Sequence, residues 1–388
     1  MPTAPFEVLP EEQLRARGSL KWQHYGPDVL PLWVAEMDVV PPPEAVEALA
    51  RAARDGDTGY PRTTPEYQEA FAGFAERTWG WSPAESDIRL CADVMTGIVA
   101  LVEALVPVGG TIVVPTPVYP PFLIFPKERG RRILPVASTP EGRLDTVAIE
   151  EALADARQTD PAHRPMLLLC SPHNPTGVVH TVEELRDVAR AAELADAIVV
   201  VDEVHAPLVR PGVEFTPWQR VTDDGFVVTS AAKAFNLAGV KAGLVIGGRR
   251  SRRELRSLPE SLQYGASHLG ILAHAAAYRS DPVWLAAVNA NIADNQTLLA
   301  GLLDTHLPQV GHQLPESTYL AWLDFRATEL GDDPGAVLLK RARVALTQGL
   351  PFGPGGQGHA RMNVACPAAV LTAAVERIAA FLAESGDS

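Results

Sequence analysis

The architecture of this 388-residue chain is indicated most clearly by residues 165–177, PMLLLCSPHNPTG. A short, continuous apolar run leads here into a polar turn sequence. Two later stretches share this design: residues 197–205, AIVVVDEVH, and residues 225–233, GFVVTSAAK. Continuous apolar runs are typical of strands buried on both faces, as in parallel sheets that are covered by helices. The three stretches therefore predict strands of one sheet, each ending in polar residues.

The surrounding sequence extends this pattern in both directions. Further strands are predicted at residues 110–115 and 242–247. Amphipathic helices are predicted at residues 44–54, 66–78, 97–106, 181–195 and 268–303, the fourth opening with a capping box formed by Thr181 and Glu184. Strands that alternate with helices favour an α/β fold, with a mostly parallel sheet wrapped by helices.

The character of the chain changes after about residue 286. Elements of a smaller α+β unit are predicted there: an alternating strand at 318–324, a helix near 334–341, a Gly-rich loop at 352–358, a strand at 361–365 and a last helix near 368–384. The first 40 or so residues have no core of their own, and we expect them to pack on this unit. The predicted organisation is a large domain, residues 44–285, and a discontinuous small domain, residues 1–43 and 286–388.

Composition excludes several classes of function. The chain has 33 Lys and Arg against 47 Asp and Glu, a net charge of −14, which argues against binding to nucleic acid or to an anionic membrane surface. Cys91, Cys170 and Cys366 are too far apart for a disulfide framework, and neither they nor the histidines have metal-ligand spacing, so no metal is expected. With no long apolar run and no leader pattern, we expect a cytoplasmic protein.

Polar residues follow three of the predicted strands at the point where each strand ends. Asn174, Asp202 and Lys233 stand at these positions. Each has an ordinary explanation by itself, because Asn is common in turns, Asp often caps a helix and Lys is usually solvated. In open α/β sheets, however, ligands bind at the carboxyl edge of the strands. We therefore expect the three side chains to share one crevice.

Together these stretches resemble the motifs of the fold-type I pyridoxal-phosphate enzymes, the aminotransferase class I/II superfamily. Other stretches are most similar to the C–S β-lyases of the MalY/PatB type, namely PLWVAEMDV at 31–39, GDTGYP at 56–61, PVYPPF at 117–122, STYLAWLDF at 317–325 and RMNVACP at 361–367. The resemblance covers most of the chain. It implies the fold-type I architecture, a pyridoxal 5′-phosphate cofactor and an amino-acid substrate.

The resemblance assigns residues to the cofactor ring. Lys233 matches the lysine that binds the cofactor covalently and later moves the substrate proton. Asp202 matches the acid that keeps the pyridine nitrogen protonated, and Asn174 matches the donor to the phenolic oxygen. Tyr119 matches the aromatic residue that stacks on the ring. His205 stands where many aminotransferases have a tyrosine, and it could equally be a buried residue behind the site.

The cofactor phosphate is expected near the start of the predicted helix at residues 97–106. Backbone amides around Thr96 and Gly97 would bind it there, because a helix N-terminus attracts anions. Ser230 adds a hydroxyl group, and Lys241 stands where aminotransferases commonly have an arginine. Tyr60 matches a tyrosine that reaches the phosphate of the neighbouring subunit, which implies a homodimer with a shared active site.

The substrate α-carboxylate is assigned to Arg361, because a guanidinium group binds a carboxylate through a planar fork. The alternative is that Arg361 makes a surface ion pair. The backbone around Ala35 resembles the segment that closes over the substrate, and Asn174 and Tyr119 would also face it.

Two reactions are compatible with these residues. A β-lyase acting on L-cystathionine or a related cysteine S-conjugate would give pyruvate, ammonia and a thiol, and an aminotransferase would exchange the amino group of an L-amino acid. The β-lyase is favoured, although Glu36, Val39 and Val178 depart from the usual lyase pattern. A third hypothesis is a regulator-binding protein with residual lyase activity, but no residue identifies a binding surface for it.

Overall fold

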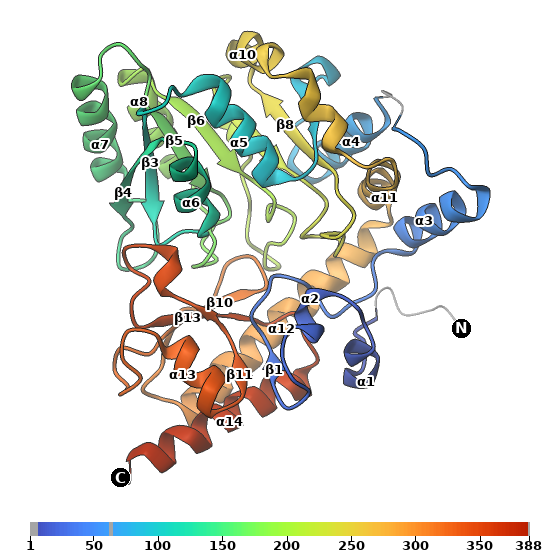
Figure 1. Ribbon diagram of the computed structural model, residues 1–388, viewed down its shortest axis with the longest axis vertical. Coiled ribbons are helices and arrows are strands. Elements are labelled where there is room, and N and C mark those ends of the chain that lie inside the picture. Colours follow the sequence, from blue (N-terminus) through green and yellow to red (C-terminus); the bar gives the residue numbers. More distant parts are fainter. Residues whose placement is uncertain (1–6, 62–64, 387–388) are drawn as a thin grey trace.

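The computed structural model describes residues 7–61 and 65–386, so the first six residues of the predicted small domain lie outside the described ranges. It has an upper part built on a seven-stranded sheet and a lower part built on a four-stranded sheet (Figure 1). The expected α/β architecture with a smaller α+β part is confirmed. The division at residues 44 and 286 stays a prediction.

The large sheet contains all five strands that the sequence predicted in this region. In spatial order its strands are β2 (Ile88–Cys91), β8 (Gly243–Gly247), β7 (Phe226–Thr229), β6 (Ile198–Asp202), β5 (Met166–Cys170), β3 (Thr111–Thr116) and β4 (Arg132–Ala137). Only β8 runs against its neighbours. The strands β2 and β4 were missed, since β2 has four residues and β4 is a largely exposed edge strand that contains Pro135.

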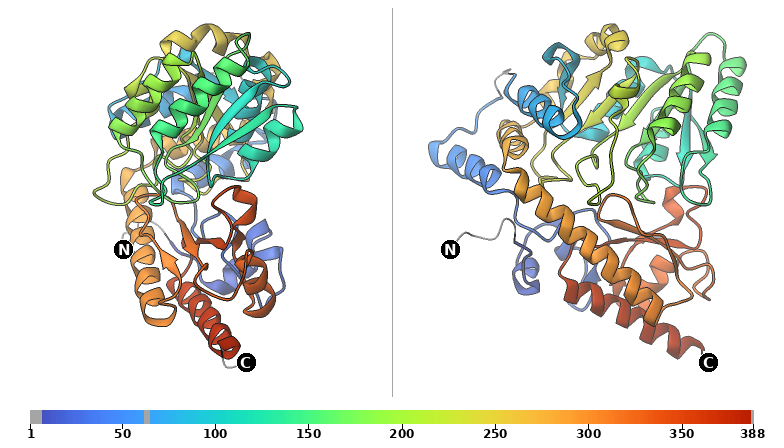
Figure 2. Two further views of the ribbon diagram at one scale, coloured as in Figure 1. Left: turned by 90° about the vertical axis from the view of Figure 1, so that its left-hand side faces the viewer. Right: turned by 180° about the vertical axis from the view of Figure 1, so that it is seen from behind.

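Both faces of this sheet are buried, which explains the continuous apolar runs. Along β3, Ile112 and Val114 join a cluster that contains residues of α5, whereas Val113 joins a second cluster that contains residues of α7 and α8. The helices of the upper part lie on the two sides of the sheet (Figure 2). They are α3 (Pro43–Asp55), α4 (Glu66–Trp79), α5 (Val94–Leu105), α6 (Pro121–Glu128), α7 (Thr146–Thr159), α8 (Val182–Leu194), α9 (Trp218–Val221), α10 (Arg252–Ser257) and α11 (His268–Arg279).

Two helix predictions need correction. The helix expected from residue 97 begins at Val94, because the side chain of Asp93 caps it by accepting a hydrogen bond from the Thr96 amide. The single helix expected at 268–303 is two helices, α11 and α12 (Pro282–His306). Pro282 cannot continue a helix from the preceding turn, but it fits the first position of a new one. The helices α6 and α7 were missed, α6 being short and containing Pro126.

The lower part contains the second sheet, in the order β12 (Thr347–Gln348), β13 (His359–Asn363), β10 (Leu320–Asp324) and β9 (Gly311–His312). Strand β13 begins and ends two residues earlier than predicted. The helices α13 (Pro334–Arg341) and α14 (Ala368–Gly386) match their predicted positions closely. The long helix α12 runs from the upper part along the lower part (Figure 2).

The N-terminal segment packs on the lower part, as expected. It forms the short helices α1 (Glu11–Arg15) and α2 (Leu20–Gln23) and the strand β1 (Leu30–Pro31), which pairs in parallel with β11 (Val344–Ala345). Segments from the two ends of the chain therefore lie side by side. Within the described ranges, the helices are all too short or too polar to cross a bilayer.

Candidate active site

The carboxyl ends of β5, β6 and β7 open onto a cavity of about 340 Å³. Nine residues that the sequence analysis singled out line this cavity: Ala35, Tyr119, Asn174, Asp202, His205, Ser230, Lys233, Lys241 and Arg361. They come from the N-terminal segment, from several strand ends of the large sheet and from β13. The cavity thus lies where the two parts of the molecule meet. The remaining three predicted residues, Thr96, Gly97 and Tyr60, do not line it.

The amine of Lys233 lies inside the cavity in the loop after β7. Its Nζ atom donates a hydrogen bond of 3.0 Å to the carbonyl oxygen of Ala35. Burial, together with the positive charge of Arg361, lowers the pKa of Lys233 to about 8. About a tenth of the amine is therefore uncharged at pH 7, far more than for an ordinary lysine, and this is the form that a nucleophile or a base requires.

Asp202 ends β6 and is buried at the floor of the cavity. One of its oxygens accepts a hydrogen bond of 2.9 Å from the Val204 amide. Its carboxyl group makes no ion pair with any described residue, and burial raises its pKa to about 7. A carboxyl group in this state would gain much from a cationic partner brought by a ligand. The adjacent Glu203 is also buried with a raised pKa, but it accepts a hydrogen bond from the Trp218 amide and does not line the cavity.

The guanidinium group of Arg361 enters the cavity from β13. It donates hydrogen bonds to Asn174 Oδ1, at 2.8 Å, and to Thr347 Oγ1, at 3.2 Å, and it lies over the ring of Phe352. Arg361 is 5% exposed and pairs with no carboxylate of the described residues, which excludes the surface ion pair. Its Nε atom is buried without a partner, and burial lowers its pKa to about 10. This group is suited to bind an incoming anion.

Asn174 reaches the cavity from the turn that follows β5. Residues 171–177 turn away at the end of β5, and the Asn174 carbonyl oxygen accepts a hydrogen bond from the Tyr119 amide. The turn therefore holds Tyr119 and Asn174 together on one side of the cavity. His205 lies beneath, with its ring 5.9 Å from that of Tyr319 and its Nδ1 atom buried without a partner. Burial lowers the pKa of His205 well below its usual value, so the ring is neutral.

The start of α5 forms the other end of the cavity. Val94 and Met95 line it with the first turn of the helix, and Asp93 caps that turn. The Thr96 amide is already bonded to Asp93, and a side chain at Gly97 would collide with Val228 and Val245 at 2.9 Å. Because α5 begins at Val94, the backbone amides of its first turn that Asp93 does not bind are those before Thr96.

Two predicted polar groups at this end have partners within the chain. Lys241 Nζ forms an ion pair of 2.9 Å with Asp93. The Ser230 hydroxyl donates to the Ala242 carbonyl oxygen at 2.7 Å and accepts from the Ala232 amide. Tyr60 is 99% exposed on the surface of the chain. Its predicted contact with a neighbouring subunit stays a prediction.

Two residues beside the cavity were missed by sequence reasoning. Asn236 and Asn363 bind backbone groups of the segment around Ala35. Asn236 lies in KAFNLAG, residues 233–239, three residues after Lys233, and Asn363 lies in RMNVACP, two residues after Arg361. Nothing in those stretches revealed their partners, which lie hundreds of residues away.

Comparison with known proteins places this geometry in a family. The model of "Aminotransferase class I and II" matches residues 27–378. The chain belongs to this family. The predicted resemblance is thereby confirmed at the level of the superfamily.

Individual relatives cover nearly the whole chain. A protein of Mycobacterium tuberculosis, provisionally named a cystathionine beta-lyase, is 45% identical over 98% of each chain. The "Cystathionine beta-lyase" of Corynebacterium glutamicum is 34% identical over 96% of this chain and 98% of that protein. A crystal structure from Corynebacterium diphtheriae, provisionally named a PLP-dependent beta-cystathionase, superimposes with a TM-score of 0.91 at 31% identity, covering 97% of this chain and 99% of that one.

Proposed function

We propose that this chain is a pyridoxal-phosphate-dependent C–S β-lyase that acts on L-cystathionine or a related cysteine S-conjugate. The observation that carries the proposal is the convergence of Lys233, Asp202, Asn174 and Arg361 on one cavity. The relatives named cystathionine beta-lyase, which are similar over their full length, favour this reaction over others in the family.

The residues of the cavity fit pyridoxal phosphate. Asp202 is a buried acid that forms no ion pair with the described residues, and it would pair with the pyridine nitrogen. The first turn of α5 and the ammonium group of Lys241 would bind the phosphate. Asn174 and Tyr119 would hold the ring from one side. When bound, the cofactor supplies an electron-withdrawing ring that stabilises negative charge on the substrate Cα.

Lys233 performs two tasks in this proposal. Its amine would hold the cofactor before substrate binds, and its lowered pKa makes the uncharged, nucleophilic form available near neutral pH. Once displaced, the same amine is the base that removes the proton from the substrate Cα. The hydrogen bond to the Ala35 carbonyl oxygen gives the free amine a defined position.

Arg361 orients the substrate by binding its α-carboxylate, for which it has an unused donor at Nε. Removal of the Cα proton then allows the C–S bond at Cβ to break, and the electron pair leaves with the sulfur as a thiolate. The remaining three-carbon fragment takes up water and gives pyruvate and ammonia. In this proposal, Lys233 is the base, Arg361 binds the carboxylate and Asp202 is the acidic partner of the ring.

The proposal includes a homodimer in which the exposed Tyr60 reaches the phosphate of the neighbouring subunit. It also includes the division of the chain into residues 44–285 and residues 1–43 with 286–388. Support for the division comes from the cavity itself, because its walls belong to both parts.

A single-turnover reaction with L-cystathionine tests the reaction type. We expect the cofactor-loaded protein to release pyruvate and a free thiol in equal amounts and to regain its starting absorption spectrum. A lasting shift to the amine form of the cofactor, without pyruvate, would instead identify an aminotransferase. Lys233→Ala is the control, and we expect it to abolish the visible band of the covalently bound cofactor and all turnover.

A further inference from the structure

Residues 33–38 cross above Lys233 without forming a helix or a strand, and we call them the strap. Backbone hydrogen bonds hold part of the strap, among them those from the Glu36 amide to the Val34 carbonyl oxygen and from the Asp38 amide to the Ala365 carbonyl oxygen, both at 2.9 Å. Several of its carbonyl oxygens are also bound by side chains from distant parts of the chain. The Ala35 carbonyl oxygen accepts hydrogen bonds from Lys233 Nζ and from the Tyr319 hydroxyl, both at 3.0 Å. The position of this oxygen is therefore set by Tyr319 together with the groups that hold the rest of the strap.

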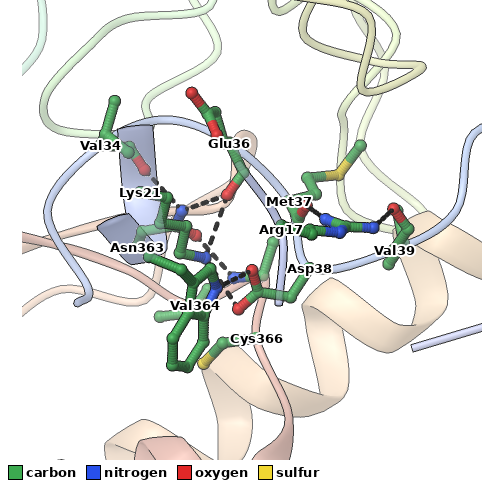
Figure 3. A network of polar contacts seen from close by, with 12 residues as sticks. Arg17, Lys21, Val34, Glu36, Met37, Asp38, Val39, Asn363, Val364 and Cys366 are labelled. Atoms are coloured by element: carbon green, nitrogen blue, oxygen red, sulfur yellow. Dashed lines mark hydrogen bonds and ion pairs between the residues drawn. The ribbon is translucent and has the colours of Figure 1, made fainter. Parts of the chain in front are cut away.

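Asn363 holds the strap on both sides of Ala35. Its Nδ2 atom donates to the carbonyl oxygens of Val34, at 2.8 Å, and Glu36, at 2.6 Å (Figure 3). Its Oδ1 atom accepts a hydrogen bond of 2.8 Å from the Ala365 amide. Asn363 is completely buried, and both ends of its amide group are bonded, so the orientation of the side chain is fixed.

Other side chains bind the strap beyond these contacts. Asn236, three residues after Lys233, accepts from the Met37 amide and donates to the Met37 carbonyl oxygen. Its φ of 56° is a left-handed conformation that Asn tolerates better than most residues. Lys21 also donates to Glu36 and pairs with Asp38 (Figure 3). Asn363 differs from Asn236 and Lys21 in one respect. Among the described residues, it is the one whose side chain binds the Val34 carbonyl oxygen.

Asn363 also connects the strap to the carboxylate clamp, since it lies two residues after Arg361 on β13. It does not line the cavity. We propose that Asn363 is a positioning residue that fixes the Ala35 carbonyl oxygen, and through it the resting place of the free Lys233 amine. This inference rests on the proposed function of Lys233 as the base. A base displaced by about 1 Å can lose roughly 100-fold in rate.

The test compares two asparagines that clamp the backbone in the same manner. Asn363→Leu keeps the branching and the number of heavy atoms of the side chain, and it removes the Nδ2 donors together with the Oδ1 acceptor. Asn295→Leu is the matched control, because Asn295 Nδ2 is also buried and donates to two carbonyl oxygens, those of Val364 and Cys366, both at 2.8 Å. Asn295 does not contact the strap and does not line the cavity.

The first measurement needs no catalysis. The full chain, freed of cofactor, is labelled with acetic anhydride over a range of pH, and acetylation of Lys233 is followed by mass spectrometry. A carbonyl acceptor favours the charged amine. We therefore expect Asn363→Leu to shift the labelling midpoint of Lys233 to lower pH, and Asn295→Leu to leave it at the wild-type value.

The second measurement uses the cofactor-loaded protein with L-cystathionine. We expect Asn363→Leu to lower kcat by about 100-fold while KM changes much less, because a misplaced base affects the transition state and not substrate binding. Asn295→Leu should keep a kcat close to the wild-type value. Should Asn363→Leu fail to fold by circular dichroism, Asn363→Ser, which is too short to reach both carbonyl groups, takes its place in both measurements.

A wild-type labelling midpoint in the Asn363 variant would overturn the proposal, as would an equal shift in the Asn295 variant. The labelling result stands even if wild-type protein releases no pyruvate. Failure of the proposed function and failure of the positioning role are thereby distinguished.

Discussion

Two buried aspartates in this chain have opposite surroundings. Asp38 pairs with Lys21 Nζ at 2.9 Å (Figure 3). It also accepts a hydrogen bond of 2.8 Å from the Trp22 indole. Asp202 has one backbone donor and no cationic partner in an ion pair among the described residues. The charge of Asp38 is neutralised within the fold, whereas Asp202 faces a cavity with its pKa raised to about 7. Burial alone therefore does not mark a functional carboxylate, whereas burial beside a cavity without an ion-pair partner makes Asp202 a candidate.

The same contrast separates the strap from the pocket. Around Asp38, the Trp22 indole donates to Oδ1 and the Lys21 ammonium supplies the opposite charge next to Oδ2, which accepts no hydrogen bond from the described residues, so these interactions serve stability. Around Asp202, Arg361 Nε and His205 Nδ1 are buried without partners. Unpaired groups of this kind cost free energy in the isolated chain, and a ligand that binds them recovers it. Substitutions at the two aspartates should therefore separate stability from activity.

Asp202→Asn should have the largest effect of these substitutions, and the effect should be on activity. It removes the charge that would face the pyridine nitrogen, and we expect kcat to fall by about 100- to 1,000-fold or more, the size of removing one preorganised electrostatic partner. The melting temperature of the cofactor-free protein should not fall. Steady-state kinetics and thermal unfolding check both statements. Asp38→Asn, the matched variant, should show the reverse pattern, and near-normal turnover of Asp202→Asn would refute its assigned role.

Lys21→Met should cause the next largest effect, this time on stability. The substitution leaves Asp38 as an unpaired buried charge, which typically costs about 3–5 kcal/mol. Urea unfolding of the cofactor-free protein measures this loss. The double variant Lys21→Met with Asp38→Asn should regain a large part of it, because no uncompensated charge remains. A double variant as unstable as the single one would show that packing, and not charge, dominates here.

The two aspartates should also differ in how they make stability depend on pH. The pKa of Asp202 is raised from its usual value to about 7 in the folded chain, so its contribution to stability is fully present below about pH 4 and is lost as the pH rises through 7. Asp202→Asn removes this loss. The cofactor-free variant should thus gain on the order of 2 kcal/mol over the wild type at pH 8 and little at pH 4. Denaturant unfolding at the two pH values tests this sign, which an equal difference at both would contradict.

An exposed ion pair should show the smallest effect. Arg54 and Glu47 pair at 2.6 Å on the surface of α3, where both side chains are largely exposed. Arg54→Ala should cost less than about 1 kcal/mol, because water compensates both charges when the pair is broken. Urea unfolding of Arg54→Ala and Lys21→Met under the same conditions compares the two losses of stability directly. A loss as large as that of Lys21→Met would mean that burial is not what makes the Lys21–Asp38 pair important.

Prediction from the sequence succeeded where local patterns are strong. The continuous apolar runs identified five of the seven strands of the large sheet, and the capping box of α8 is present as predicted, with Thr181 and Glu184 bonded reciprocally. It failed where local signals are weak or conflicting. The edge strand β4 has an apolar run, but Pro135 within it argues against a strand, and the break between α11 and α12 depended on Pro282.

The candidate site shows the same division. Nine of the twelve predicted site residues line one cavity, because the carboxyl ends of parallel strands meet at one edge of a sheet. The helix begins at Val94, three residues before the predicted start at residue 97, and Val94 and Met95 line the cavity where Thr96 and Gly97 were expected. A capping interaction of this kind depends on backbone geometry, and a one-turn shift changes which amides are free.

By itself, the sequence determined the α/β architecture, the residues at the strand ends and the resemblance to a cofactor-dependent family, because these are encoded in runs of neighbouring residues. Only the tertiary structure decided which groups are paired and which are left free. Lys21 with Asp38, and Asn363 with the strap, join positions separated by 17 and 327 to 329 residues. Such contacts arise when separate elements pack together, so local patterns contain no signal for them. The difference between a satisfied and an unsatisfied buried charge is therefore a property of the folded chain.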